Sequence, residues 1–134
     1  FIPVDGARLH ILDDGPRTGQ AIVFLHGIAT MGIDFPLTGT PDRLVAQGYR
    51  CLCIDRPGYG HSTRGRARIW TAWRQGQAIW QALDRLGIDR PVLVGHSFGT
   101  QVALSMAAQR PGQVAGQVLV SGYYFPTARI EPYT

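Results

Sequence analysis

The residues with the clearest capacity for chemistry form the pentapeptide Gly95-His96-Ser97-Phe98-Gly99. It lies between an apolar run, residues 91–94, and a stretch of helical character, residues 100–109. A serine on a sharp turn between a strand and a helix projects its hydroxyl from the end of a sheet, where it can attack a substrate. The pattern therefore predicts that Ser97 is a nucleophile.

The neighbours of Ser97 fit this prediction. A tight turn crowds the backbone, so the positions two before and two after the serine need to lack a side chain, and Gly95 and Gly99 do. We expect Ser97 to adopt a strained conformation of the kind that accompanies function. Phe98 begins the following helix, so its N–H is expected to be free to face a developing negative charge.

The elements that position this turn follow from hydrophobic patterning. Continuous apolar runs predict strands buried on both faces, over residues 21–25, 50–54 and 91–94, and a last strand over 118–120. Helical spacing and caps predict helices over 41–47 (Thr40 as N-cap, Gly48 as stop), 73–86 (Trp73 and Trp80 packed on the sheet) and 100–109. Alternating strands and helices predict an α/β fold, with a mostly parallel sheet covered by helices on both faces.

The chain is expected to open with an antiparallel hairpin. Ile2 and Val4, then Leu9 and Ile11, alternate around Asp5-Gly6, which is a strong hairpin signal. The polar stretch over residues 13–20 predicts a turn. His10 has no evident partner in this prediction.

Three loops with motif character follow three of the predicted buried strands. They span residues 26–34, 55–62 and 95–99. In a parallel sheet the ligand crevice lies outside the carboxyl ends of the strands, so we expect these loops to meet at one edge.

These loops carry a resemblance to the α/β-hydrolase fold family. The matching motifs are Phe24-Leu25-His26-Gly27, Asp55-Arg56-Pro57-Gly58-Tyr59-Gly60-His61-Ser62 and Gly95-His96-Ser97-Phe98-Gly99. The resemblance implies that Ser97 is the nucleophile and that the oxyanion hole consists of the Phe98 N–H and the Ile28 N–H, with Ala29 as the less favoured second donor. It implies no metal or organic cofactor, and a small-molecule acyl substrate.

The resemblance also suggests supporting roles for the remaining motif residues, His26, Gly27, Gly95, His96, Gly99 and Asp55. His26 is expected to hydrogen-bond its loop rather than act as a base. Asp55 is expected to organise its own loop, with the role of triad acid less favoured. Two rival serines lack the pair of flanking glycines: Ser62 has a glycine two positions before it but an arginine two after, and Ser121 has neither glycine.

The chain departs from the family pattern after the serine. In this fold the triad runs from Ser to Asp or Glu and then to His. Only 134 − 97 = 37 residues follow Ser97, and they include one acid, Glu131, and no histidine. We therefore interpret residues 1–134 as a single partial domain, incomplete at its C-terminal side. We expect this chain alone to have negligible esterase turnover.

The favoured function is a serine hydrolase that acts on an ester or related acyl substrate through an acyl-enzyme. Alternatives within the fold are acyl transfer, perhydrolysis and C–C bond hydrolysis. A non-catalytic binding module with a hydrolase-like fold is a further alternative. The serine argues against the haloalkane dehalogenases and epoxide hydrolases of this fold, which use an aspartate at that position.

The composition of the chain indicates which classes of binding partner to expect. All 13 basic residues are arginine and the net charge is +4. We attribute this bias to genome composition in preference to nucleic-acid binding. The cluster Arg64, Arg66 and Arg68 lacks interleaved aromatic residues, so we expect no nucleic-acid partner. Cys51 and Cys53 share one strand face and are interpreted as buried thiols rather than a disulfide or a zinc site. No run is long enough to cross a membrane, and a cytoplasmic location is the default expectation.

Overall fold

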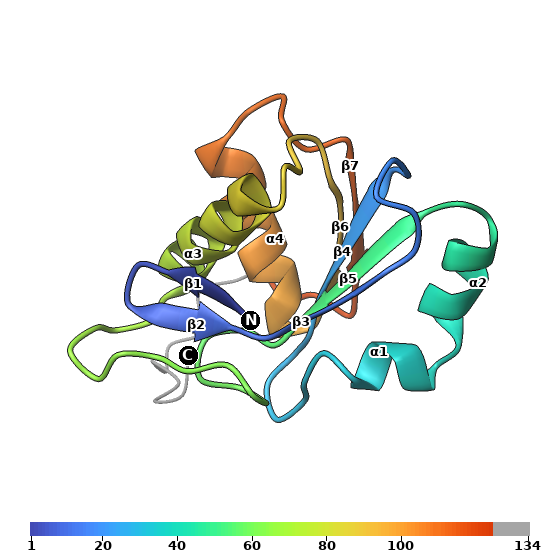
Figure 1. Cartoon of the computed structure of the whole chain (residues 1–134). Coiled ribbons are helices and arrows are strands. Elements are labelled where there is room, and N and C mark those ends of the chain that lie inside the picture. The colour runs from blue at the N-terminus through green and yellow to red at the C-terminus, as the bar shows by residue number, and fades with distance from the viewer. Residues whose placement is uncertain (125–134) are drawn as a thin grey trace.

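A five-stranded sheet in the order β3-β5-β4-β6-β7 forms the centre of the protein, whose computed structural model describes residues 1–124 (Figure 1). Strands β4, β5, β6 and β7 are parallel, and β3 runs antiparallel to β5. The bounds are β3 (Ile11–Asp14), β4 (Ala21–Leu25), β5 (Arg50–Ile54), β6 (Val92–His96) and β7 (Gly116–Val120). The predicted α/β class with a mostly parallel sheet is confirmed.

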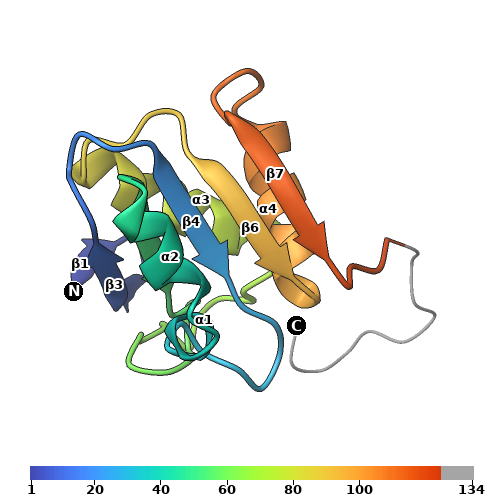
Figure 2. The same ribbon diagram turned by 90° about the vertical axis from the view of Figure 1, so that its right-hand side faces the viewer.

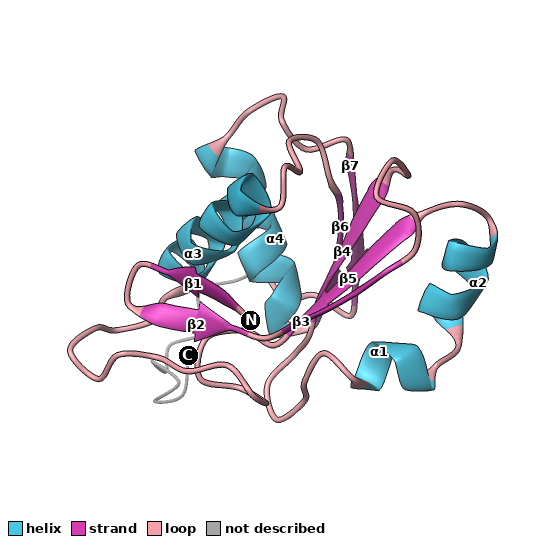
Figure 3. Cartoon of the chain, in the orientation of Figure 1, coloured by secondary structure: helices cyan, strands magenta, loops and turns pink. Residues whose placement is uncertain are grey.

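Helices cover both faces of this sheet, as expected (Figures 1 and 3). α3 (Ala72–Arg85) and α4 (Phe98–Gln109) lie on one face, and α1 (Asp34–Leu37) and α2 (Thr40–Ala46) lie on the other. Every residue of β4 and β5 is buried, because each strand packs on both sides. Alternate side chains therefore enter two separate cores: Val23, Leu25, Leu52 and Ile54 face one, and Ile22, Phe24, Cys51 and Cys53 face the other. The prediction of burial on both faces is wrong for β6, because Val92 and Val94 are only half-buried and Val94 borders an open groove.

The two cysteines are buried free thiols on the same strand face, as the period-two spacing predicts. Burial raises the pKa of both thiols, that of Cys53 to about 12. They therefore behave as small apolar residues of the core.

Helices α3 and α4 pack closely against each other. A Cβ at Gly76 would lie 3.1 Å from Met106 Cγ, so the missing side chain permits the approach. Trp80 is buried and its indole N–H donates to the Met106 carbonyl at 3.0 Å. Trp73, by contrast, is 48% exposed. The prediction that it packs on the sheet is wrong, because Trp73 lies in the first turn of α3 and points away from the core.

The N-terminal hairpin forms as predicted, but it is shorter. β1 (Ile2–Val4) pairs antiparallel with β2 (Ala7–Leu9) as a separate two-stranded sheet. Ile11 belongs instead to β3, which pairs with β5. Residues 13 and 14 also lie in β3, so the prediction that they form part of a turn is wrong. The Asp13 carboxylate accepts two hydrogen bonds from the buried Arg50 of β5, at 2.8 and 2.6 Å. An exposed charged residue on an edge strand also disfavours pairing with another chain.

Helix α2 begins one residue earlier than expected. Its N-cap is Gly39, with φ +75°, and Thr40 is already helical. Gly39 adopts a left-handed conformation that links the short, unpredicted α1 to α2. Neither this pair nor any other helix in residues 1–124 is long and apolar enough to traverse a bilayer.

Candidate active site

Strand register brings the three motif loops to one edge of the sheet. Leu25 lies opposite Ile54 on one side and Gly95 on the other. The next residue of each strand, His26, Asp55 and His96, therefore lies in the same row at the carboxyl ends. Figure 2 shows β4 and β6 side by side, with β7 at the edge beyond them.

Ser97 lies at the turn between β6 and α4 in a strained conformation, as predicted. Its φ is +52° and its ψ is −120°, a combination that a residue with a Cβ rarely adopts. A Cβ at Gly95 would lie 2.6 Å from the Gly99 carbonyl oxygen, and a Cβ at Gly99 would lie 2.7 Å from the Leu25 carbonyl carbon. Both glycines are therefore required by the close approach of β6, α4 and β4.

Two backbone N–H groups beside Ser97 have no partner among residues 1–124. They belong to Phe98, at the start of α4, and Ile28, in the loop after β4. The two loops are in contact, because a Cβ at Gly27 would lie 3.1 Å from the Ser97 Cβ. Unpaired amides from two loops next to a serine can stabilise negative charge on a reacting oxygen. Ala29, the alternative donor, follows Ile28 with φ +60°.

His26 is buried, and backbone groups occupy both of its ring nitrogens. Nδ1 lies 2.8 Å from the Gly27 carbonyl oxygen, and Nε2 accepts the Arg56 N–H at 2.9 Å. Burial and the nearby Arg56 charge lower the pKa of His26 to about 4, so the ring is neutral at pH 7. Its nitrogens bind the two loops together and are not free to take a proton from Ser97.

Because His26 is neutral in the folded protein, we expect the protein to lose stability in weak acid. The pKa of His26 is about 4 when folded and 6.5 when unfolded, so the unfolded chain binds the extra proton between these values and stability falls as pH drops through that range. Lowering the pH from 7.5 to 5.0 is expected to reduce the free energy of unfolding by about 2 kcal/mol through this residue. Urea titration at the two pH values measures the change.

Two variants isolate the contribution of His26. His26→Gln, which has no titrating ring, should lose much less stability over this pH interval than the native chain. His96→Gln changes an exposed histidine and should keep the full loss. An equal loss in the His26→Gln protein would contradict the assignment.

The Asp55 carboxylate organises the loops around it. It accepts the N–H of Gly32 at 2.7 Å and of His61 at 2.9 Å, and it lies 2.9 Å from Nδ1 of His10. Burial alone would raise the pKa of Asp55, but these hydrogen bonds outweigh it and hold the pKa below its usual value. The expectation that His10 lacks a partner is therefore wrong, because the hairpin folds back toward the loop after β5.

Arg56 is the residue at the site that sequence reasoning missed. It is fully buried and contacts the loops after β4, β5 and β6. Nothing in the local sequence distinguishes it from an exposed loop arginine, since its burial depends on distant neighbours such as Gln75. Glu131, the one acid after Ser97, lies outside the described residues. His96 is exposed.

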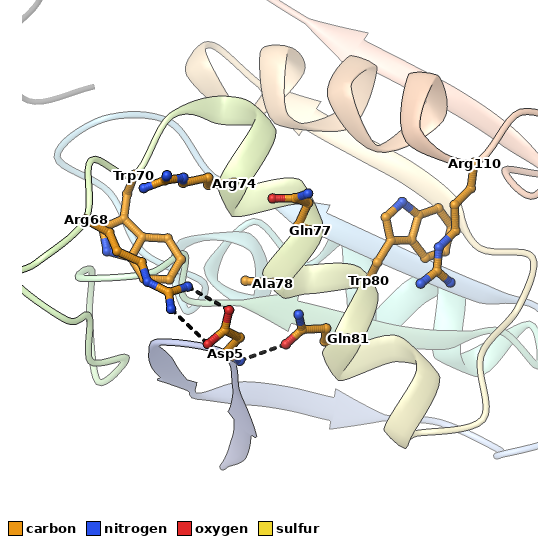
Figure 4. A pocket seen from close by; sticks show the side chains of 9 residues that line it. All are labelled: Asp5, Arg68, Trp70, Arg74, Gln77, Ala78, Trp80, Gln81 and Arg110. Carbon is orange, nitrogen blue, oxygen red and sulfur yellow. Dashed lines mark hydrogen bonds and ion pairs between the residues drawn. The ribbon is translucent and has the colours of Figure 1, made fainter.

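Ser97 does not line either of two hollows in the described part of the chain. An apolar groove of about 520 Å³ runs along the sheet face between α1 and β7, bordered by Phe35, Val94, Val118 and His96. A polar pocket of about 360 Å³ lies between the hairpin and α3 (Figure 4). Its arginines are largely engaged, since Arg68 binds Asp5 and Arg110 binds Asp84. Residues 1–124 contain no cluster of metal-ligating side chains.

Comparison with known proteins places this arrangement in a family. The family model described as the alpha/beta hydrolase fold matches residues 20–132. The chain belongs to the α/β-hydrolase fold family. It is 32% identical over 123 residues to a haloalkane dehalogenase of Mycobacterium marinum, covering 91% of this chain and 40% of that protein. It is 32% identical to epoxide hydrolase B of Mycobacterium tuberculosis, covering 87% of this chain and 33% of that protein.

A solved esterase of the same fold is also similar. The esterase from Exiguobacterium antarcticum superposes with a TM-score of 0.78 at 28% identity, covering 89% of this chain and 43% of that structure. The α/β-hydrolase chain described here thus spans less than half the length of these relatives. All three relatives are hydrolases, and this supports the interpretation of the chain as part of a hydrolase.

Proposed function

We propose that this chain carries the nucleophile and the oxyanion hole of a serine hydrolase that acts on an ester or related acyl substrate. The observation that carries the proposal is the strained turn at Ser97, with unpaired amides of Ile28 and Phe98 in the two adjoining loops. We further propose that residues 1–134 belong to one domain of this enzyme.

In the proposed reaction the Ser97 hydroxyl oxygen attacks the substrate carbonyl carbon, and its proton passes to a base. The carbonyl oxygen becomes negative and accepts hydrogen bonds from the Ile28 and Phe98 amides. Collapse of this intermediate expels the alcohol, which takes the proton, and leaves an acyl-enzyme. Water then attacks the acyl carbon, giving the free acid and restoring the serine.

The base is expected to be a histidine that follows Ser97 in the chain, in the order typical of this fold. Among residues 1–124 no ring nitrogen lies within hydrogen-bond distance of the Ser97 hydroxyl. The reaction is therefore to be tested on the protein at its natural length.

The choice between acyl chemistry and the chemistry of the other relatives rests on residue 97. Haloalkane dehalogenases and epoxide hydrolases of this fold are expected to use an aspartate there, and this chain has a serine. A serine oxygen with an oxyanion hole suits attack on a carbonyl, in which negative charge develops on the substrate oxygen.

Labelling with a fluorophosphonate tests the proposal. The probe phosphonylates an activated serine, so mass spectrometry of the natural-length protein should find one adduct, on the peptide that contains Ser97. Prior denaturation should prevent the reaction. Absence of an adduct on Ser97 in the folded protein would instead favour a non-catalytic binding module.

A further inference from the structure

The Gly27 carbonyl oxygen is held by three donors at once. The His26 ring Nδ1 lies 2.8 Å away, the Thr30 hydroxyl donates at 3.0 Å, and the Arg56 guanidinium donates at 3.0 Å. Arg56 also donates through Nε to the neighbouring His26 carbonyl, at 2.8 Å. This part of the loop after β4 is therefore fixed from the carbonyl side.

The Gly27 carbonyl belongs to the same peptide group as the Ile28 N–H. This peptide is trans, so its C=O and N–H point in opposite directions. Holding the oxygen toward Arg56 consequently turns the Ile28 N–H away from Arg56. Donation to a carbonyl also polarises its peptide group and strengthens the N–H as a donor.

Arg56 also contacts the second candidate donor loop. Its guanidinium carbon lies 4.8 Å from the ring centroid of Phe98 and 4.4 Å from that of Tyr59. One buried side chain thus contacts the peptide group that carries the Ile28 N–H, through the Gly27 carbonyl, and also contacts the ring of Phe98.

The Arg56 guanidinium is fully buried with its positive charge. Among residues 1–124 no carboxylate lies within ion-pair distance of its guanidinium, and Gln75 supplies a neutral acceptor instead. The adjacent Asp55 carboxylate is engaged by His10, Gly32 and His61. An uncompensated cation in a low-dielectric interior is costly, and a negative charge that develops nearby lowers that cost.

We propose that Arg56 is a positioning residue for the reaction at Ser97: it orients and polarises the Gly27–Ile28 peptide through the Gly27 carbonyl, and its unneutralised charge favours the negative oxygen of the intermediate. This inference rests on the proposed serine-hydrolase function. It assigns Arg56 no direct contact with the substrate.

The test compares steady-state hydrolysis of p-nitrophenyl acetate by variants of the natural-length protein. Rates are expressed per active site, counted by fluorophosphonate titration to completion. Arg56→Met should lower kcat per site by about 30-fold and leave KM within about threefold, since the lost interaction is made in the transition state. Inhibition by a trifluoromethyl ketone, which forms a tetrahedral oxyanion adduct, should weaken in parallel. Arg56→Lys should restore part of the loss.

A second variant separates the charge of Arg56 from its shape. Gln75→Glu keeps Arg56 and puts a carboxylate against its guanidinium, although it also removes the amide that donates to the Trp70 carbonyl. It is expected to lower kcat per site by about fivefold. If Arg56→Met does not fold, the Gln75→Glu variant alone tests the proposal. The control is Arg50→Met, which removes another buried arginine, one held by Asp13 at the opposite end of β5. This control should cost stability and leave kcat per site unchanged.

The outcomes are distinguishable. If the losses in Arg56→Met and Gln75→Glu vanish once rates are expressed per titrated site, Arg56 is structural only and the inference is overturned. If Ser97→Ala hydrolyses the ester as well as the native protein does, the serine-hydrolase function fails first, whatever the Arg56 variants show.

Discussion

Ser97→Ala is expected to lower kcat for ester hydrolysis by at least about 10⁴-fold in the natural-length protein. The hydroxyl is the proposed nucleophile, and alanine removes it without adding volume to the crowded turn. Stability should fall little, because the described structure gives the Ser97 hydroxyl no hydrogen bond to lose. The measurements are kcat for p-nitrophenyl acetate and the urea midpoint of each protein.

A rival serine provides the control. Ser121 also has a positive φ, +51°, and follows β7 at the same edge of the sheet, but it lacks the flanking glycines. Ser121→Ala should retain kcat within about twofold. If Ser121→Ala abolished hydrolysis and Ser97→Ala did not, the nucleophile would have been assigned to the wrong turn.

Gly99→Ala should destabilise the fold by about 3 kcal/mol or more. The added Cβ would meet the backbone of the end of β4, 2.7 Å from the Leu25 carbonyl carbon and 2.9 Å from the His26 carbonyl oxygen. Backbone atoms cannot turn aside as a flexible side chain can, so α4 must move away from β4. The urea or thermal unfolding midpoint of the variant measures this loss.

The matched control for Gly99 is a glycine with open space around it. A Cβ at Gly116 would meet nothing within 4 Å, and Gly116 is not in the left-handed region. Gly116→Ala should therefore change the free energy of unfolding by less than about 1 kcal/mol. Equal stability of the two variants would show that α4 and β4 are not in close contact at the turn.

Features encoded by neighbouring residues could be predicted from the sequence. The apolar run of β4 and the glycines around Ser97 identify a buried strand and a sharp turn without any knowledge of the rest of the chain. The same holds for Gly87, which ends α3 with a left-handed residue. In these segments local preference and tertiary packing agree.

Features that depend on distant partners could not be predicted. Strand β3 contains Asp13, and no local pattern reveals its pairing with the Arg50 side chain, 37 residues away. The contact of His10 with Asp55 spans 45 residues. From the sequence, Arg56 resembles an exposed loop arginine, and only the fold shows that its guanidinium contacts buried carbonyl groups and aromatic rings. The positions of these charged groups are set by pairings that no local pattern records.

The hydrogen bond between the Ser97 N–H and the Val120 carbonyl, 2.9 Å long, has a consequence for the order of folding. During synthesis the ribosome must release the chain as far as β7 before this amide finds its acceptor. In a nascent chain that ends before Val120, the turn at Ser97 therefore lacks this hydrogen bond.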